Sequence, residues 1–453
     1  MLSKTGFWII SVMDPRPNNQ ERFSWQGPTL LLSLIYLSIT ISMMLVVPPG
    51  EAPDEPAHIQ YVDHVLEHRR LPPAYGGADE TTYEAHQPPL FYLATAAFLR
   101  VTGTGAVCYP FVSNPDFEFT GDGRRAFVDQ TRGGKVERAA RRVMLARLPS
   151  IFLGLFSVWA VVFLVERVRR DVGIGVAAAV CFTLFPQFLF SSATVTNDVG
   201  LSAMSAIATM SLVCSIIEGP KRTFWAIMAS LSTGLALWMK ASGLCLFPGL
   251  LIVLILSVRR HQWSAALWFL APAGGLGIGW FLLNFARFGR WTPALPTGWN
   301  GEYSEGLQRL LSEPWWLVST WGSFWAKFGW FNLPMPKLMY LVFLLPTAMV
   351  AVGIVAMASR PSFRCGVLPV LSSILGTNLL LYLVFLVTAD WQPQGRFLFP
   401  SIAALAAFAA VGFDEAGRWI PRRFNRVAVL AVFCLFFSTC VFTVWFIRSN
   451  YVP

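Results

Sequence analysis

Charged residues are scarce in this sequence. They make up 13% of the 453 residues, against 55% hydrophobic residues. This balance excludes an ordinary soluble domain, which carries about twice that share of charge.

Several motifs are also absent. The seven cysteines mostly fall in apolar runs, and Cys108 alone lies in a polar loop, so neither a disulfide framework nor a zinc ribbon is predicted. There are no internal repeats, no Walker loop and no glycine-rich nucleotide motif. The net charge of +10 does not indicate nucleic acid as a partner, because the basic residues lie in short loops where membrane orientation requires them.

Long apolar runs are what the sequence has instead. Each run is about 20 residues long, which is the length that a bilayer demands of a spanning helix. Eleven runs qualify as candidate spans: 28–47, 146–166, 172–190, 196–217, 222–239, 243–258, 263–284, 337–358, 365–388, 397–413 and 426–447. We therefore predict an all-α polytopic membrane protein, with residues 1–453 forming one transmembrane domain and no soluble C-terminal domain.

Basic residues predict how the chain is oriented. Lys4, Arg16, Arg22 and the basic alternate loops place the N-terminus in the cytoplasm and the C-terminus outside. Two large loops, 48–145 and 285–336, then lie outside, and the second holds seven of the 18 tryptophans. The apolar run 89–101 is too short to span, so we expect an amphipathic or interfacial helix within the first loop.

Acidic and imidazole side chains gather in the first loop, directly after the first apolar run. Residues 54–68 are expected to form a helix that begins with Asp54 and Glu55. Such groups at a membrane boundary indicate a functional site. The alternative is structural: Asp54 caps the helix, and Glu55 lies in its positively polarised first turn.

A divalent metal is a further hypothesis for this loop. Glu55, His58 and His86 approach one another from two sides of a turn-forming stretch. Carboxylate oxygen suits Mg or Mn, and imidazole suits Zn or Mn. The spacing matches no defined metal signature.

Other polar residues stand at the predicted outer ends of spans. Asn197 and Asp198 begin the fourth span, where they either contact substrate or cap the helix. Lys240 ends the fifth span, where it either contacts an anionic phosphate or headgroup, or snorkels to the interface.

One more polar cluster precedes the tenth span. Gln394 and Arg396 lie there, with Gly395 between them expected to allow close approach of a ligand. Arg396 is a candidate ligand for an anionic group, because its planar fork holds two oxygens at once. The alternatives are an ion pair with Asp390 and an interfacial lipid contact.

The order of these motifs resembles a known group. PDEPAH follows the first span, HQPPLFY opens the interfacial helix, ARLPSIF opens the second span, and QGRFLFP comes near the end. This order resembles the GT-C-fold membrane glycosyltransferases, which include protein O-mannosyltransferases and the aminoarabinose transferase of lipid A. It resembles in particular a bacterial family of predicted membrane proteins with a PPxxxPDEPAH motif.

The resemblance implies a reaction. Such enzymes take a sugar from a polyprenyl-phosphate carrier in the bacterial inner membrane and transfer it, on the outer face, to a lipid, glycan or protein acceptor. It implies catalysis by the Asp54–Glu55 pair. Two alternatives stay open, a transporter or flippase of a lipid-linked sugar and a non-catalytic cell-envelope assembly protein of the same fold. The polar residues lie at loop ends rather than at mid-span, which favours an enzyme.

The resemblance also implies roles for single residues. His86 stands where the aminoarabinose transferase has a metal-binding Glu, and Gln87 stands where it has a phosphate-contacting Lys. The missing Lys leaves the donor phosphate to Arg396 and Lys240. We expect substrate contacts from Gln87, Gln394, Asn197 and Asp198.

Overall fold

The computed structural model describes residues 26–73, 82–118, 124–128, 134–169, 174–218, 221–292, 303–364, 366–389 and 391–451. These residues are almost entirely helical. The α-helices are α1 (Gln26–Val46), α2 (Glu55–His68), α3 (Leu90–Val101), α4 (Gly134–Val168), α5 (Val176–Thr183), α6 (Pro186–Ser192), α7 (Asn197–Ile217), α8 (Arg222–Met239), α9 (Phe247–Arg259), α10 (Trp263–Phe288), α11 (Tyr303–Ser312), α12 (Trp315–Trp325), α13 (Leu341–Ala358), α14 (Pro361–Arg364), α15 (Val367–Thr388), α16 (Ile402–Ala416) and α17 (Asn425–Tyr451).

Short 3₁₀ helices and one small hairpin complete the described structure. The 3₁₀ helices are η1 (Tyr83–His86), η3 (Ala241–Leu246), η4 (Lys337–Tyr340), η5 (Gly395–Ser401), η6 (Gly417–Trp419) and η7 (Arg422–Phe424). Strands β1 (Lys327–Phe328) and β2 (Leu333–Pro334) pair antiparallel, with Phe328 opposite Leu333.

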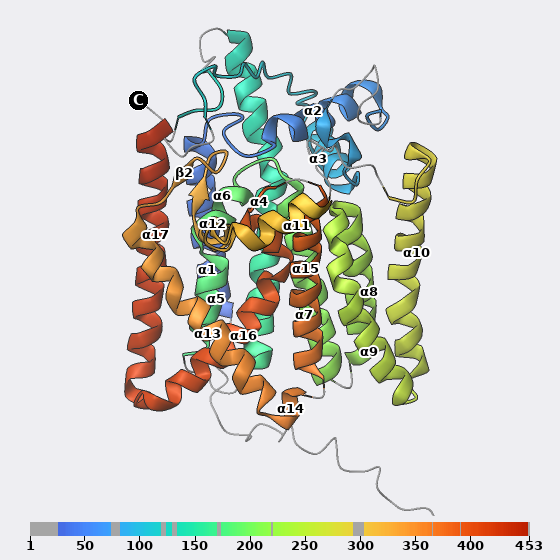
Figure 1. Cartoon of the computed structure of the whole chain (residues 1–453), viewed down its shortest axis with the longest axis vertical. Helices are drawn as coiled ribbons and strands as arrows, with labels where there is room; N and C mark the ends of the chain where they lie inside the picture. The colour runs from blue at the N-terminus through green and yellow to red at the C-terminus, as the bar shows by residue number, and fades with distance from the viewer. Residues whose placement is uncertain are drawn as a thin grey trace, which may run out of the picture.

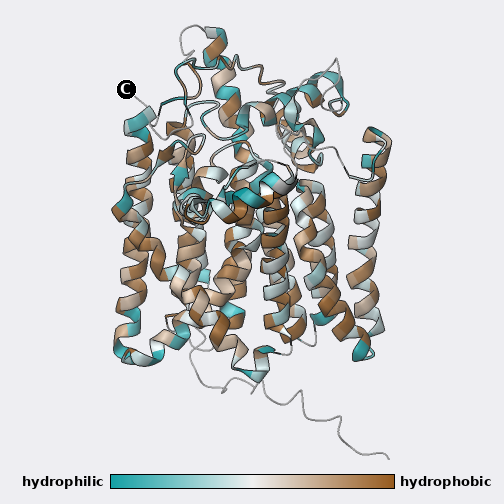
Figure 2. Cartoon of the chain, in the orientation of Figure 1, coloured by the Kyte–Doolittle hydropathy of each residue, from teal (hydrophilic) through white to brown (hydrophobic). Residues whose placement is uncertain are grey.

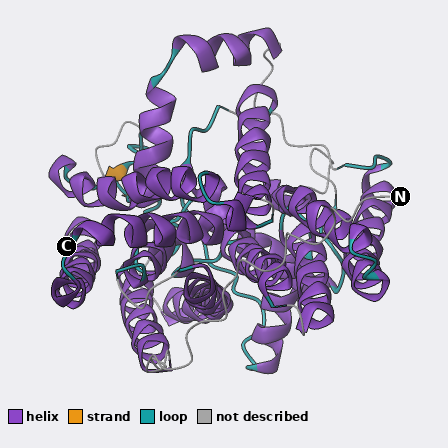
Figure 3. Cartoon of the chain, turned by 90° about the horizontal axis from the view of Figure 1, so that it is seen from below, coloured by secondary structure: helices purple, strands orange, loops and turns teal. Residues whose placement is uncertain are grey.

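Nine of the described helical segments are long and apolar enough to cross a membrane. They confirm nine of the eleven predicted spans and the prediction of a polytopic all-α protein. Figure 1 shows the helices standing side by side, and Figure 2 shows hydrophobic residues dominating their middle. Figure 3 shows the chain from below, with several of these helices close to end-on.

The other two predicted spans take a different form. Residues 222–239 form α8, with the predicted bounds but a less apolar composition than the nine. Residues 172–190 contain two short helices, α5 and α6, because Pro186 cannot continue a helix that runs into it. Both short helices are almost wholly buried within the protein, so they need not reach the length that lipid contact demands.

The run Pro89–Val101 is not a span, as predicted. It forms α3, which has 12 residues and packs against α2. Both helices lie at one end of the bundle, the upper end in Figure 1. The predicted loop 48–145 is partly helical at its end, since α4 already begins at Gly134.

Glycines allow the central helices to pack closely. A Cβ added at Gly353 on α13 would collide with the backbone carbonyl of Phe408 on α16, and one at Gly412 would collide with that of Met349. Small residues at such crossings let two helix backbones meet directly. Together with α7, α16 is among the most buried of the spans, and η5, which leads into it, lies against α7.

Candidate active site

Asp54 stands at the start of α2 in an unusual backbone conformation. Its φ is 63°, in the left-handed region, and its side chain makes no capping hydrogen bond to the helix. The carboxylate instead accepts a hydrogen bond of 3.1 Å from the Tyr83 hydroxyl and pairs with Arg396. The capping alternative for Asp54 is therefore wrong. A left-handed non-glycine residue is costly, and such strain is often kept at functional sites.

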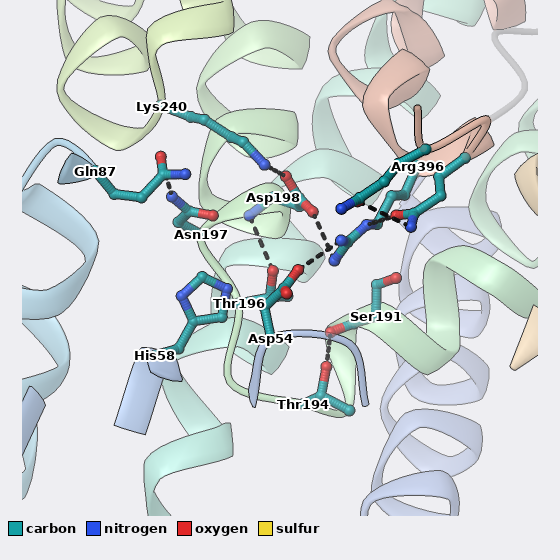
Figure 4. Close-up of polar contacts among 12 residues, drawn as sticks. Asp54, His58, Gln87, Ser191, Thr194, Thr196, Asn197, Asp198, Lys240 and Arg396 are labelled. Atoms are coloured by element: carbon teal, nitrogen blue, oxygen red, sulfur yellow. Dashed lines mark hydrogen bonds and ion pairs between the residues drawn. The ribbon is translucent and has the colours of Figure 1, made fainter. Parts of the chain in front are cut away.

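Two ion pairs form the centre of the site (Figure 4). One Nη of Arg396 lies 2.6 Å from Asp54, and Lys240 Nζ lies 2.5 Å from Asp198. The other Nη of Arg396 is 3.6 Å from Asp198, so the two pairs are joined. The four groups come from α2, α7, the end of α8 and η5, at one end of the bundle.

Neighbouring residues hold these groups in place. Thr196 caps α7 by accepting a hydrogen bond from the backbone N–H of Asp198, at 3.2 Å. The Asn197 amide donates to the Gln87 side chain and to the carbonyl of Met239, both at 3.2 Å. Gln394 accepts a hydrogen bond of 2.8 Å from Arg396 Nε. The structure thus brings together all the residues predicted to bind phosphate and substrate.

Arg396 is also held by aromatic rings. Its guanidinium carbon lies 5.4 Å from the ring centre of Phe331 and 5.3 Å from that of Phe397, distances at which a cation is attracted to a ring face. Asp390 lies outside the described residues, whereas Asp54 is the partner that the structure shows.

Gly395 has a different role from the one predicted. A Cβ at this position would collide with the backbone of α12 at Phe324 and Thr320. Its N–H donates to the Ser323 hydroxyl at 2.8 Å. The glycine therefore allows close approach of η5 to α12, rather than of a ligand, and this contact positions Arg396.

Glu55 takes part in a separate, buried ion pair. Arg147 of α4 donates to both of its carboxylate oxygens, at 2.8 and 2.7 Å, and both side chains are fully buried. The backbone N–H groups of Gly50 and Val195 donate to the same oxygens, each at 3.0 Å. Four donors leave this carboxylate no free role in catalysis or metal binding, so the geometry corrects both predicted roles.

The two remaining candidate metal ligands, His58 and His86, also make hydrogen bonds within the protein. His58 Nδ1 lies 2.9 Å from the Tyr92 hydroxyl, and His86 Nδ1 lies 2.9 Å from the carbonyl of Tyr83. Among the described residues, no group of three or more His, Cys, Asp or Glu side chains is arranged to hold a metal ion. Within the described structure, Glu55, His58 and His86 thus do not form a group arranged to hold the divalent metal that the sequence suggested.

Burial and charge determine the protonation of the site. Burial alone would raise the pKa of Asp54, but the charge of Arg396 holds it below its usual range. Burial lowers the pKa of His58, and it lowers that of His86 to about 4. At neutral pH we expect Asp54 to be ionised and both imidazoles to be neutral.

Three further residues of the site lie outside the predicted catalytic, substrate-binding and metal-binding sets. Glu84, from η1, is only 6% exposed, burial raises its pKa, and its Oε2 has no hydrogen-bond partner within the described structure. Tyr83 donates a hydrogen bond to Asp54, and Arg147 forms the ion pair with Glu55. The YEAH segment next to the Pro-Pro pair was the available signal for Glu84 and Tyr83, and the Arg-Leu-Pro element was the signal for Arg147.

Sequence comparison identifies a family. Residues 137–406 match the model of a family described as "Predicted membrane protein (DUF2142)". No curated protein matches the chain by sequence.

Three solved structures are similar to this chain. ArnT from Cupriavidus metallidurans in the apo state superposes with a TM-score of 0.53 at 15% identity, over 94% of this chain and 77% of ArnT. The same enzyme bound to undecaprenyl phosphate gives 0.47 at 14% identity, over 94% and 76%. The Archaeoglobus fulgidus oligosaccharyltransferase, tethered to an acceptor peptide, gives 0.49 at 12% identity, over 94% and 56%. At these identities the likeness to apo ArnT establishes the GT-C fold and does not establish an activity.

Proposed function

The chain belongs to the DUF2142 family of predicted membrane proteins, and we propose that it is a membrane glycosyltransferase. It would transfer a sugar from a polyprenyl-phosphate donor to a lipid, glycan or protein acceptor. The single observation that carries the proposal is the Asp54–Arg396 pair at 2.6 Å. In this proposal Asp54 is the base and Arg396 is the cation that binds the donor phosphate, at one end of the helix bundle.

Arg396 and Lys240 suit the phosphate of such a donor. The lipid tail of the donor stays in the bilayer, so its phosphate must lie at the membrane boundary, where these two cations stand. Negative charge grows on the phosphate as the sugar leaves, and a fixed cation there stabilises the transition state. An arginine does this well, since its fork binds two oxygens and stays charged.

Asp54 suits the role of base. A phosphate on Arg396 would share the charge that holds the pKa of Asp54 down, so donor binding makes Asp54 more basic. The acceptor oxygen attacks the anomeric carbon and its proton passes to Asp54. The bond between the anomeric carbon and the phosphate oxygen breaks, and its electron pair leaves with polyprenyl phosphate.

Glu84 and His58 complete the proposed site. Burial favours the neutral form of Glu84, and its Oε2 has no partner among the described residues. This oxygen can therefore bind a sugar or acceptor hydroxyl. Gln87, Gln394, Asn197 and Asp198 would line the same site and position the substrates.

The proposed location follows from charge. We place the protein in the bacterial inner membrane, with loops 48–145 and 285–336 and the Asp54 site on the extracytoplasmic side. Basic residues in the opposite loops support this orientation.

The test follows the donor itself. In cells that overproduce the protein, mass spectrometry of extracted lipids should show that sugar-linked polyprenyl phosphate is depleted relative to empty-vector cells. Asp54→Asn should abolish the depletion, because base catalysis is worth about 10²–10⁴ in rate. Asp116→Asn, an exposed carboxylate of the same loop, is the matched control and should behave as wild type. Full depletion by an equally abundant Asp54→Asn protein would refute the proposal.

A further inference from the structure

A separate groove opens beside the active site. It has a volume of about 580 Å³, within the range of ligand pockets. Its walls come from α2, α3, α8 and α10, on the right of Figure 1. Most of its lining side chains are apolar: Val65, Leu66, Leu71, Pro89, Leu93, Ala96, Ala97, Trp238 and Leu283.

Three arginines also line this otherwise apolar groove. They are Arg69, Arg70 and Arg100, and all three are exposed. Within the described residues, none of them has an ion pair with an acidic side chain. The end of the protein where they lie is the one we place outside the cytoplasm, where the usual bias of positive charge gives no reason for three arginines.

The backbone conformation at the end of α2 positions one of these arginines, Arg69. Arg69 caps the end of α2 with φ 54°, in the left-handed region, and its N–H donates to the carbonyl of Val65 at 3.0 Å. Glycine or asparagine usually occupies this position, because other residues pay a steric cost there. The turn brings Arg69 to the groove next to Arg70.

The two features together identify one class of ligand. A soluble anion would not need apolar walls, and a neutral lipid would not need three guanidinium groups. A lipid phosphate can accept bidentate hydrogen bonds from arginine while a hydrocarbon chain covers the walls. We propose that this groove binds an anionic phospholipid, with its phosphate among Arg69, Arg70 and Arg100 and an acyl chain along α3 and α8.

The groove is close to the catalytic cluster but distinct from it. Pro89 and Trp238 line the groove, and each lies two residues from a site residue, Gln87 and Lys240 respectively. A bound lipid therefore packs against the segments that hold these two side chains. This inference concerns binding alone and does not depend on the proposed transfer reaction.

Native mass spectrometry of the full chain in detergent tests the inference. Phosphatidylglycerol and phosphatidylcholine with identical acyl chains are titrated in parallel. We expect the wild type to prefer phosphatidylglycerol by at least about tenfold, since basic side chains near a lipid surface attract lipids with a net negative charge. The triple variant Arg69→Gln, Arg70→Gln, Arg100→Gln should lose this preference.

Two further variants make the test specific. Arg422→Gln, Arg423→Gln, Arg426→Gln removes the same charge from exposed arginines of η7 and the start of α17, and should keep the preference. Ala97→Trp fills the groove from an exposed position without changing charge. It should weaken phosphatidylglycerol binding even if the triple groove variant fails to fold.

Three results would overturn the inference. One is a wild type that binds both lipids equally. Another is an equal loss of preference in the two triple variants. Undecaprenyl phosphate is titrated as a third lipid, and the third result is a groove variant that loses it but retains phosphatidylglycerol, because the groove would then hold the donor chain. Failure of the proposed transferase reaction would appear only in the Asp54→Asn experiment and would leave these outcomes unchanged.

Discussion

Neighbouring carboxylates Asp54 and Glu55 should respond in opposite ways to the loss of their charge. Glu55 is fully buried and accepts four hydrogen bonds, two of them from Arg147. Asp54 is 24% exposed and faces the site. Glu55→Gln should therefore destabilise the fold, whereas Asp54→Asn should abolish transfer and leave the fold largely intact.

The burial and partners of each carboxylate indicate how much folding free energy each substitution should cost. Arg147 is 0% exposed and also donates to the carbonyls of Met44, Val47 and Pro48, so it cannot move out to water when Glu55 loses its charge. Removing one partner of such a buried pair costs about 3–5 kcal/mol. Asp54 is partly solvated and Arg396 keeps Asp198 as a second partner, so Asp54→Asn should cost about 1 kcal/mol.

Equilibrium unfolding in mixtures of SDS and a mild detergent measures both variants. Glu67→Gln is the control, because it removes a carboxylate from an exposed position of the same helix and should change stability by less than about 0.5 kcal/mol. Lipid analysis of donor turnover is run beside it. If Glu55→Gln unfolds like the wild type but loses transfer, Glu55 takes part in the chemistry and our structural account of it is wrong.

Four other predictions follow from the same site and loop. Arg396→Lys should keep part of the donor turnover, because lysine keeps the positive charge but cannot hold two phosphate oxygens at once. Arg396→Ala should lose nearly all of it. Equal turnover in Arg396→Ala and wild type would place the phosphate elsewhere. Burial raises the pKa of Glu51 from 4.5 to about 7. Protonated Glu51 therefore favours folding at low pH, and this contribution to stability is lost as the pH rises through about 7. Glu51→Gln should flatten that part of the stability–pH curve, and an unchanged slope would contradict this. Exhaustive chelation should leave turnover intact, since Glu55 has no free oxygen for a metal, and a loss restored by Mg, Mn or Zn would refute that reading. With the exposed native Cys108 replaced by serine, a membrane-impermeant maleimide should label Ser113→Cys in intact cells, and labelling only after lysis would reverse the orientation.

Composition and local pattern alone determined much of the fold. Runs of about 20 apolar residues must cross a bilayer as helices, because the backbone has no other partner there. That requirement acts on each segment separately, so nine spans and the short helix α3 could be predicted without knowing their neighbours. The 172–190 region departed from prediction, since Pro186 divides it and the surrounding protein replaces lipid.

The polar residues of the site were also predictable as a group. Asp54, Asp198, Lys240 and Arg396 are ionisable residues at apolar boundaries, and such residues are costly unless they are used. The paired residues lie 42 positions apart for Asp198 and Lys240 and 342 apart for Asp54 and Arg396, and the sequence contained no information on which would pair.

Only the tertiary structure decided what each group does. Asp54 and Glu55 are adjacent in sequence, and both fit a helix start equally well by residue type. Arg147 reaches Glu55 from α4, and Arg396 reaches Asp54 from η5. These long-range partners determine which carboxylate is buried and fully bonded and which faces the site. The division of roles depends on packing between distant helices, which no local pattern encodes.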